Sequence, residues 1–172
     1  MVVELLAFPA NVNIINLVIL AFLIFVTELI FFFVPGISVS GLLIAMSALH
    51  YGFLLTFVVS IIPIVIAHFF LIRRPTVFIA DIMTIIPMIL FAATLGPVLI
   101  GFSKFWGWSI FGALFSVVKW GVALPVGYAL GSNIAKRMRE ILLEPIGSFF
   151  VFKLNFVFAF LFAAGLLKFW PS

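Results

Sequence analysis

Five ionisable side chains lie inside long apolar stretches of this sequence, and their types could do chemistry there. They are Glu28, His68, Asp81, Lys119 and Lys153. Carboxylates, imidazoles and amines can take up and release protons, hold cations or pair with anionic groups. A charge in hydrocarbon is costly unless it is paired or faces water. We therefore expect these groups to meet one another or to line a wet cavity inside a membrane.

Four of these side chains are predicted to share one layer. Counted at about 1.5 Å per residue, His68 and Asp81 lie about 10 Å from the turn between them, at residues 73–74. Glu28 and Lys153 have a similar depth in their own apolar stretches. We expect Glu28 or Asp81 to pair with Lys153, and His68 to form a hydrogen bond with Asp81. The alternative is that these residues only tie helices together.

Lys119 and two prolines add to this candidate site. Lys119 lies near the middle of its stretch, too deep for its stem to reach either interface, so it should face protein or a wet cavity, reaching toward Glu28. Pro63 and Pro87 stand at nearly equal distances from the turn at residues 73–74. We expect both to kink their helices at one level. Such kinks can mark a transporter binding site, although proline is also ordinary in membrane helices.

The composition predicts the elements that must position these residues. Only 8% of the chain is charged, 67% is hydrophobic, and the mean hydropathy is +1.49. These values predict an all-α, polytopic transmembrane bundle of five to six spans, forming one membrane domain over residues 1–172. The stretch 37–72 is too long for one span and too short for two, so its first part is expected to be short or re-entrant. The expected spans are 13–34, 38–49, 53–72, 76–102, 106–131 and 146–170, with an interfacial basic connector at 134–144.

Basic residues are concentrated in two loops that are two spans apart, and so lie on the same side. By the positive-inside rule this is the cytoplasmic side of a cell membrane, plasma or inner, where basic groups contact anionic lipid headgroups. The residues concerned are Arg73, Arg74, Lys136, Arg137 and Arg139.

Several classes of function are not expected. The chain has no cysteine, its two histidines have no metal-site spacing, and it contains no phosphate-binding loop or serine nucleophile motif. No dense basic face suggests nucleic acid. We expect no catalytic residues, no metal and no cofactor.

Two functions remain open. The first is a non-enzymatic membrane subunit that packs with partner membrane proteins or with copies of itself. The second is a small-solute or ion transporter, or the membrane-embedded substrate-binding subunit of one, which uses the Glu/Asp/His/Lys layer. A transport site needs access to water, whereas a purely structural layer would be dry and paired.

Overall fold

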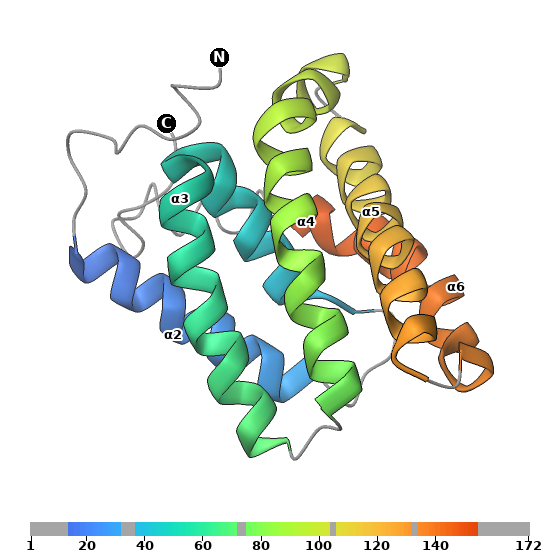
Figure 1. Ribbon diagram of the computed structural model, residues 1–172. Helices are drawn as coiled ribbons and strands as arrows, with labels where there is room; N and C mark the ends of the chain where they lie inside the picture. Colours follow the sequence, from blue (N-terminus) through green and yellow to red (C-terminus); the bar gives the residue numbers. More distant parts are fainter. Residues whose placement is uncertain (1–13, 32–36, 72–74, 104–105, 132–133, 155–172) are drawn as a thin grey trace.

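The computed structural model describes residues 14–31, 37–71, 75–103, 106–131 and 134–154, excepting the side chains of Val77 and of residues 134–137. Every regular element in these ranges is helical, which confirms the predicted helical bundle. Consecutive helices pack against one another, and the last of them also touches α3 (Figure 1). The elements are α2 (Ile14–Phe31), α3 (Val39–Phe70), α4 (Pro75–Phe102), α5 (Gly107–Ala129), α6 (Ile134–Val151) and the 3₁₀ turn η1 (Phe152–Leu154).

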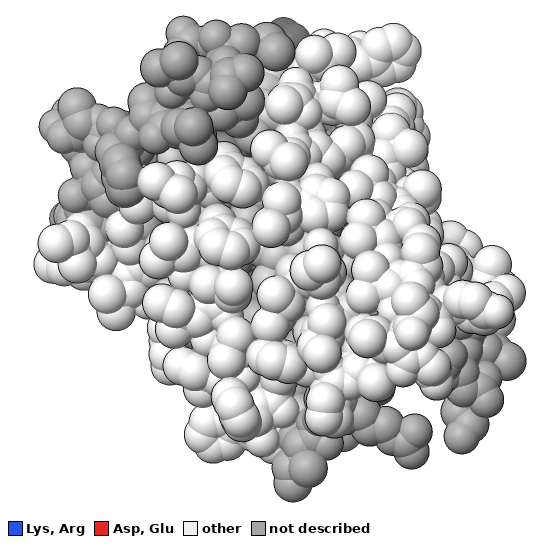
Figure 2. All heavy atoms as spheres, viewed as in Figure 1, with Lys and Arg blue, Asp and Glu red and all other residues white. Residues whose placement is uncertain are grey.

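The surface of the bundle is apolar where a soluble protein would be polar. Helices α2, α3 and α5, and Phe78–Phe102 of α4, are long and apolar enough to cross a membrane. Large apolar side chains such as Phe22, Phe69 and Val98 are exposed. Figure 2 shows a face on which the described residues present no charged side chain. The protein is therefore a multi-pass integral membrane protein.

Helix α3 is broken at Gly52, between the spans predicted at 38–49 and 53–72. Gly52 has φ 75° and ψ −173°, a conformation essentially restricted to glycine. The segment before the break, Val39–Tyr51, is about 20 Å long at 1.5 Å per residue, shorter than a ~30 Å hydrocarbon core. We call it the half-helix. Its residues from Ser40 to Ala48 are all buried, so it lies in the centre of the bundle and not at its edge.

The end of the chain differs from the sequence prediction. The expected connector at 134–144 and the start of the span expected at 146–170 form one helix, α6, which runs through Pro145. Good helix formers fill the stretch before Pro145, and proline removes only one backbone hydrogen bond. The remainder of the predicted span, 155–170, lies outside the described residues.

The two prolines of the predicted hairpin lie within helix. Pro63 is in α3 and Pro87 is in α4. The non-helical residue inside α3 is Gly52, eleven positions before Pro63, so glycine and not proline breaks this helix. The break thus lies toward the opposite end of the bundle from His68.

Candidate functional site

The first part of the candidate site consists of two hydrogen bonds between α5 and α6. Lys119 Nζ lies 2.7 Å from one carboxylate oxygen of Glu144, and the indole Nε1 of Trp120 donates to the other at 2.9 Å. Glu144 is only 6% exposed. Both carboxylate oxygens are therefore satisfied by donors from α5, and this fixes the register of α6 against it.

Glu144 is a site residue that sequence reasoning missed. It is the last residue of the interfacial connector predicted at 134–144, directly before Pro145. In the continuous helix it faces α5 instead of the headgroups. The signal for it in the sequence is the lone mid-span Lys119, which is predicted to reach toward Glu28 but pairs with Glu144.

A second polar contact lies next to this ion pair. The hydroxyls of Ser116 and Ser148 are 2.5 Å apart and buried. Nearby, a Cβ added to Gly112 would overlap the Phe152 side chain and lie 2.6 Å from the Ser148 carbonyl oxygen. Helices α5 and α6 approach this closely only because small residues line their contact, as in many membrane helix pairs.

The second part of the site joins the end of α3 to the start of α4. His68 Nε2 lies 3.1 Å from Asp81 Oδ2, the hydrogen bond that the sequence predicts. The other ring nitrogen, Nδ1, lies 2.8 Å from the Ile64 carbonyl oxygen. The side chains are 4% and 14% exposed, and the Phe78 ring lies beside the imidazole. Both ring nitrogens of His68 are therefore engaged in a largely buried position.

The third part joins α2 to the half-helix. The Ser40 hydroxyl, in the first turn of the half-helix, donates to Glu28 Oε1 at 2.6 Å. A carboxylate is favoured at this position because backbone N–H groups and the helix dipole make the amino end of a helix positive. Glu28 is thus held where a helix begins inside the bundle.

These three parts are related through Lys119, which acts electrostatically on Asp81 and Glu28 as well as on its bonded partner Glu144. Each described α-helix contributes one ionisable side chain to the three contacts, and we call these five side chains together the ionisable cluster. Its members are Glu28, His68, Asp81, Lys119 and Glu144.

Lys153 lies far from Asp81, so the predicted pairing of these two residues is wrong, while its alternative pairing with Glu28 stays a prediction. Its Nζ lies 5.0 Å from the Trp106 ring centroid, and the Trp106 backbone N–H donates to Ser103 at the far end of α4. Along α4 this position is about 30 Å from Asp81 at 1.5 Å per residue. The error follows from α6, which starts at Ile134 and so carries Lys153 across the bundle.

The residues of the two predicted basic loops are only partly described. Arg73 and Arg74 lie outside the described residues, as do the side chains of Lys136 and Arg137. Arg139 is exposed in the first part of α6.

Polar side chains on α3 extend from the cluster toward the Gly52 bend. Thr56 and Ser60 precede His68 by twelve and eight residues, so all three lie along one face of the helix. Thr56 shares a hydrogen bond of 3.0 Å with Ser47 of the half-helix. The buried Ser60 hydroxyl has no hydrogen-bond partner within the described part of the chain. A buried hydroxyl of this kind is suited to a water molecule or a passing polar group.

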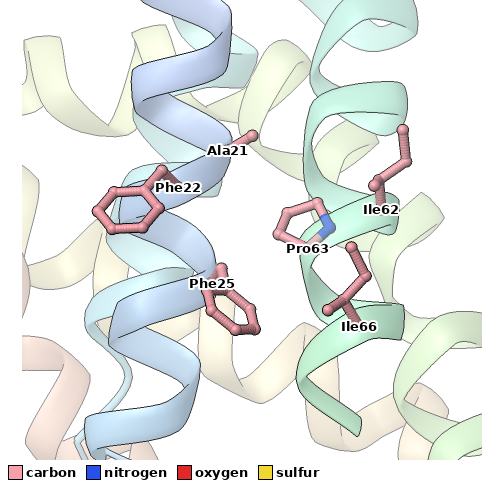
Figure 3. A pocket seen from close by; sticks show the side chains of 6 residues that line it. All are labelled: Ala21, Phe22, Phe25, Ile62, Pro63 and Ile66. Carbon is pink, nitrogen blue, oxygen red and sulfur yellow. The ribbon is translucent and has the colours of Figure 1, made fainter. Parts of the chain in front are cut away.

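A separate groove lies between α2 and α3 beside Pro63 (Figure 3). Its volume is about 230 Å³, and its exposed lining is wholly apolar. It offers dispersion contacts but no ionisable group, so it is not part of the polar site. The lining residues are Ala21, Phe22, Phe25, Ile62, Pro63 and Ile66.

The fold and the cluster together define a multi-pass integral membrane protein with an ionisable site inside its helical bundle. Within the described ranges, no group of three or more His, Cys, Asp or Glu side chains is arranged to hold a metal ion. No protein-family model, curated protein or solved structure matches the chain.

Proposed function

We propose that this protein transports a small solute or ion across the membrane, and that the ionisable cluster is its binding site. The observation that carries the proposal is that each described α-helix holds one ionisable side chain in a contact with a neighbouring helix, and that His68 and Glu144 among them are buried. Chains of Asp, Glu and His inside a membrane are a common feature of proton relays and ion pathways.

The energetics favour a functional role over a purely structural one. A charged side chain at the centre of a membrane helix costs about 2.5–3.5 kcal/mol on insertion scales. A polar contact between membrane helices contributes about 0.6 kcal/mol on average. Several ionisable groups are therefore an expensive way to hold helices together, since small apolar residues pack them at lower cost.

The half-helix supports the same proposal. Discontinuous helices in transporters place their amino ends inside the membrane, where backbone N–H groups face anionic groups. Here the first turn of the half-helix bonds to Glu28, which belongs to the ionisable cluster. The buried Ser60 hydroxyl lies on α3 between His68 and the break at Gly52. Polar atoms therefore continue along α3 from the cluster toward the other membrane face.

The test is transport by the purified protein in liposomes, with currents recorded after proton or metal-ion gradients are imposed. Lys119→Met and Glu144→Gln should abolish most of the current. Lys153→Met and Glu140→Gln are matched controls, since each removes the same charge from the same or a neighbouring helix outside the cluster. Equal currents from cluster and control variants, or no current from folded wild type under any gradient, would reject the proposal.

The second candidate is a non-enzymatic subunit of a larger membrane complex. The observation in its favour is that the groups of the cluster are paired and that His68 and Glu144 are buried, which is the dry arrangement expected of a structural layer. Purification in native nanodiscs with mass spectrometry separates the two. Stoichiometric protein partners together with absent transport support the subunit. A chain that is isolated alone or as a homo-oligomer and carries current supports the transporter.

A further inference from the structure

The hydrogen bonds of His68 determine which ring nitrogen carries a proton. A backbone carbonyl oxygen can only accept a hydrogen bond, so the contact between Nδ1 and the Ile64 oxygen requires a proton on Nδ1. In a neutral imidazole the other nitrogen, Nε2, then has a lone pair and no proton. That lone pair points at Asp81 Oδ2, 3.1 Å away.

Two lone pairs do not attract at this distance, so a further proton must lie between the two atoms. From this we infer that His68 and Asp81 form a proton-binding site that holds one exchangeable proton between Nε2 and Oδ2. The proton is either on Nε2, giving imidazolium and carboxylate, or on Oδ2, giving neutral imidazole and carboxylic acid. In both arrangements the pair has no net charge, which suits its burial in the membrane.

Within the described part of the chain, a charged group that acts on this pair comes from the neighbouring helix α5. Lys119 of α5 acts electrostatically on Asp81, and it also interacts with Glu28 of α2 and Glu144 of α6. The uncharged Phe78 ring of α4 lies against the imidazole. When the proton leaves for the aqueous phase, the pair gains one negative charge and loses its hydrogen bond. The end of α3 and the start of α4 then lose the contact between these side chains.

This inference rests on the proposed function where it names the proton as the transported or coupled ion. The proton is taken from water on one side, bound between Nε2 and Oδ2, and released to water on the other. No other bond is made or broken. Proton occupancy changes the contact between α3 and α4, and this links binding to a movement of helices.

The experiment is nitrogen NMR of the full chain in nanodiscs, with the histidine rings labelled with ¹⁵N. The chain has two histidines, so His50→Gln assigns both ring systems. We expect His68 Nδ1 to carry the proton that it donates to Ile64, and Nε2 to share a hydrogen-bonded proton that exchanges with solvent deuterium. In Asp81→Asn the amide donates to Nε2, so the shared proton should be lost, while an unchanged His50 signal reports correct folding.

The possible outcomes separate this site from the proposed function. A bare Nε2 with an ionised Asp81 at all pH values, a proton that never exchanges, or identical His68 signals in wild type and Asp81→Asn would each overturn the proton site. A pH-sensitive dye inside liposomes then tests transport. A shared proton without any proton flux rejects proton transport but keeps the site, whereas flux without a shared proton rejects the site and keeps transport.

Discussion

Glu144 shows how one side chain can organise two helices. Its two oxygens accept hydrogen bonds from adjacent residues of α5, one from the flexible amine of Lys119 and one from the rigid indole of Trp120. The indole fixes where the carboxylate lies, and the amine balances its charge. Loss of either donor, Lys119 or Trp120, would leave one oxygen of the buried Glu144 carboxylate without its hydrogen bond.

We predict that Lys119→Met destabilises the protein. The substitution leaves the buried Glu144 carboxylate without its counter-charge, which costs about 2–3 kcal/mol, less than a fully buried pair because Lys119 is partly exposed. Thermal unfolding in mild detergent measures this loss. Lys153→Met is the control and should unfold within a few degrees of wild type.

A double variant tests whether charge is the cause. Gln at position 144 still accepts from Trp120 and carries no charge, so Lys119→Met combined with Glu144→Gln should recover about half of the lost stability. If the double variant is less stable than Lys119→Met alone, the Lys119–Glu144 pair does not stabilise this contact.

At the scale of elements, α5 and α6 depend on a small residue at their closest approach. We predict that Gly112→Ala lowers stability by about 1–3 kcal/mol, because the new methyl group overlaps Phe152 and the Ser148 carbonyl. Gly121→Ala on the same helix meets nothing within 4 Å and should be neutral or slightly stabilising. Unfolding in detergent compares the two. Equal melting temperatures would show that α5 and α6 are not packed as described.

The break in α3 depends on Gly52 in the same way. We predict that Gly52→Ala costs about 1–3 kcal/mol, because its φ of 75° with ψ near 180° strains any residue with a Cβ. Gly101→Ala, which meets nothing within 4 Å, is the control. Native-state proteolysis or unfolding in detergent provides the measurement. An unaffected Gly52→Ala variant would mean that α3 passes through this point without a break.

The sequence predicted those parts of the site that depend on short-range geometry. His68 and Asp81 flank one tight turn at similar distances, so their contact follows from helix rise alone, and the break near Gly52 follows from the length of the apolar stretch. Lys153 and Glu144 could not be placed, because their depth depends on where α6 begins. Pro145 lies between the predicted connector and the predicted last span, as if a new helix began at that residue. In the structure, the residues before Pro145 already belong to the same helix.

For the whole molecule, the helix directions predict which exposed positions face the same side of the membrane. The last turns of α3 and α5 lie at one end of the bundle, and the Gly52 bend and the start of α5 lie at the other (Figure 1). Phe70 and Tyr128 belong to the first end, and His50 and Trp106 to the second. The native chain has no cysteine, so single-cysteine variants at these positions give unambiguous labelling. A membrane-impermeant thiol reagent should label the first two from one side and the others from the opposite side. Labelling of all four from one side would contradict a membrane-spanning bundle.

The central position of the half-helix has a consequence for how the chain is made. Its residues from Ser40 to Ala48 are buried, in part against α4 and α5, which leave the ribosome later. At about 20 Å it is too short to cross the bilayer by itself. It therefore reaches its final position only after most of the protein has been synthesised. During that interval, lipid or the insertion machinery must shelter a segment that the finished protein encloses.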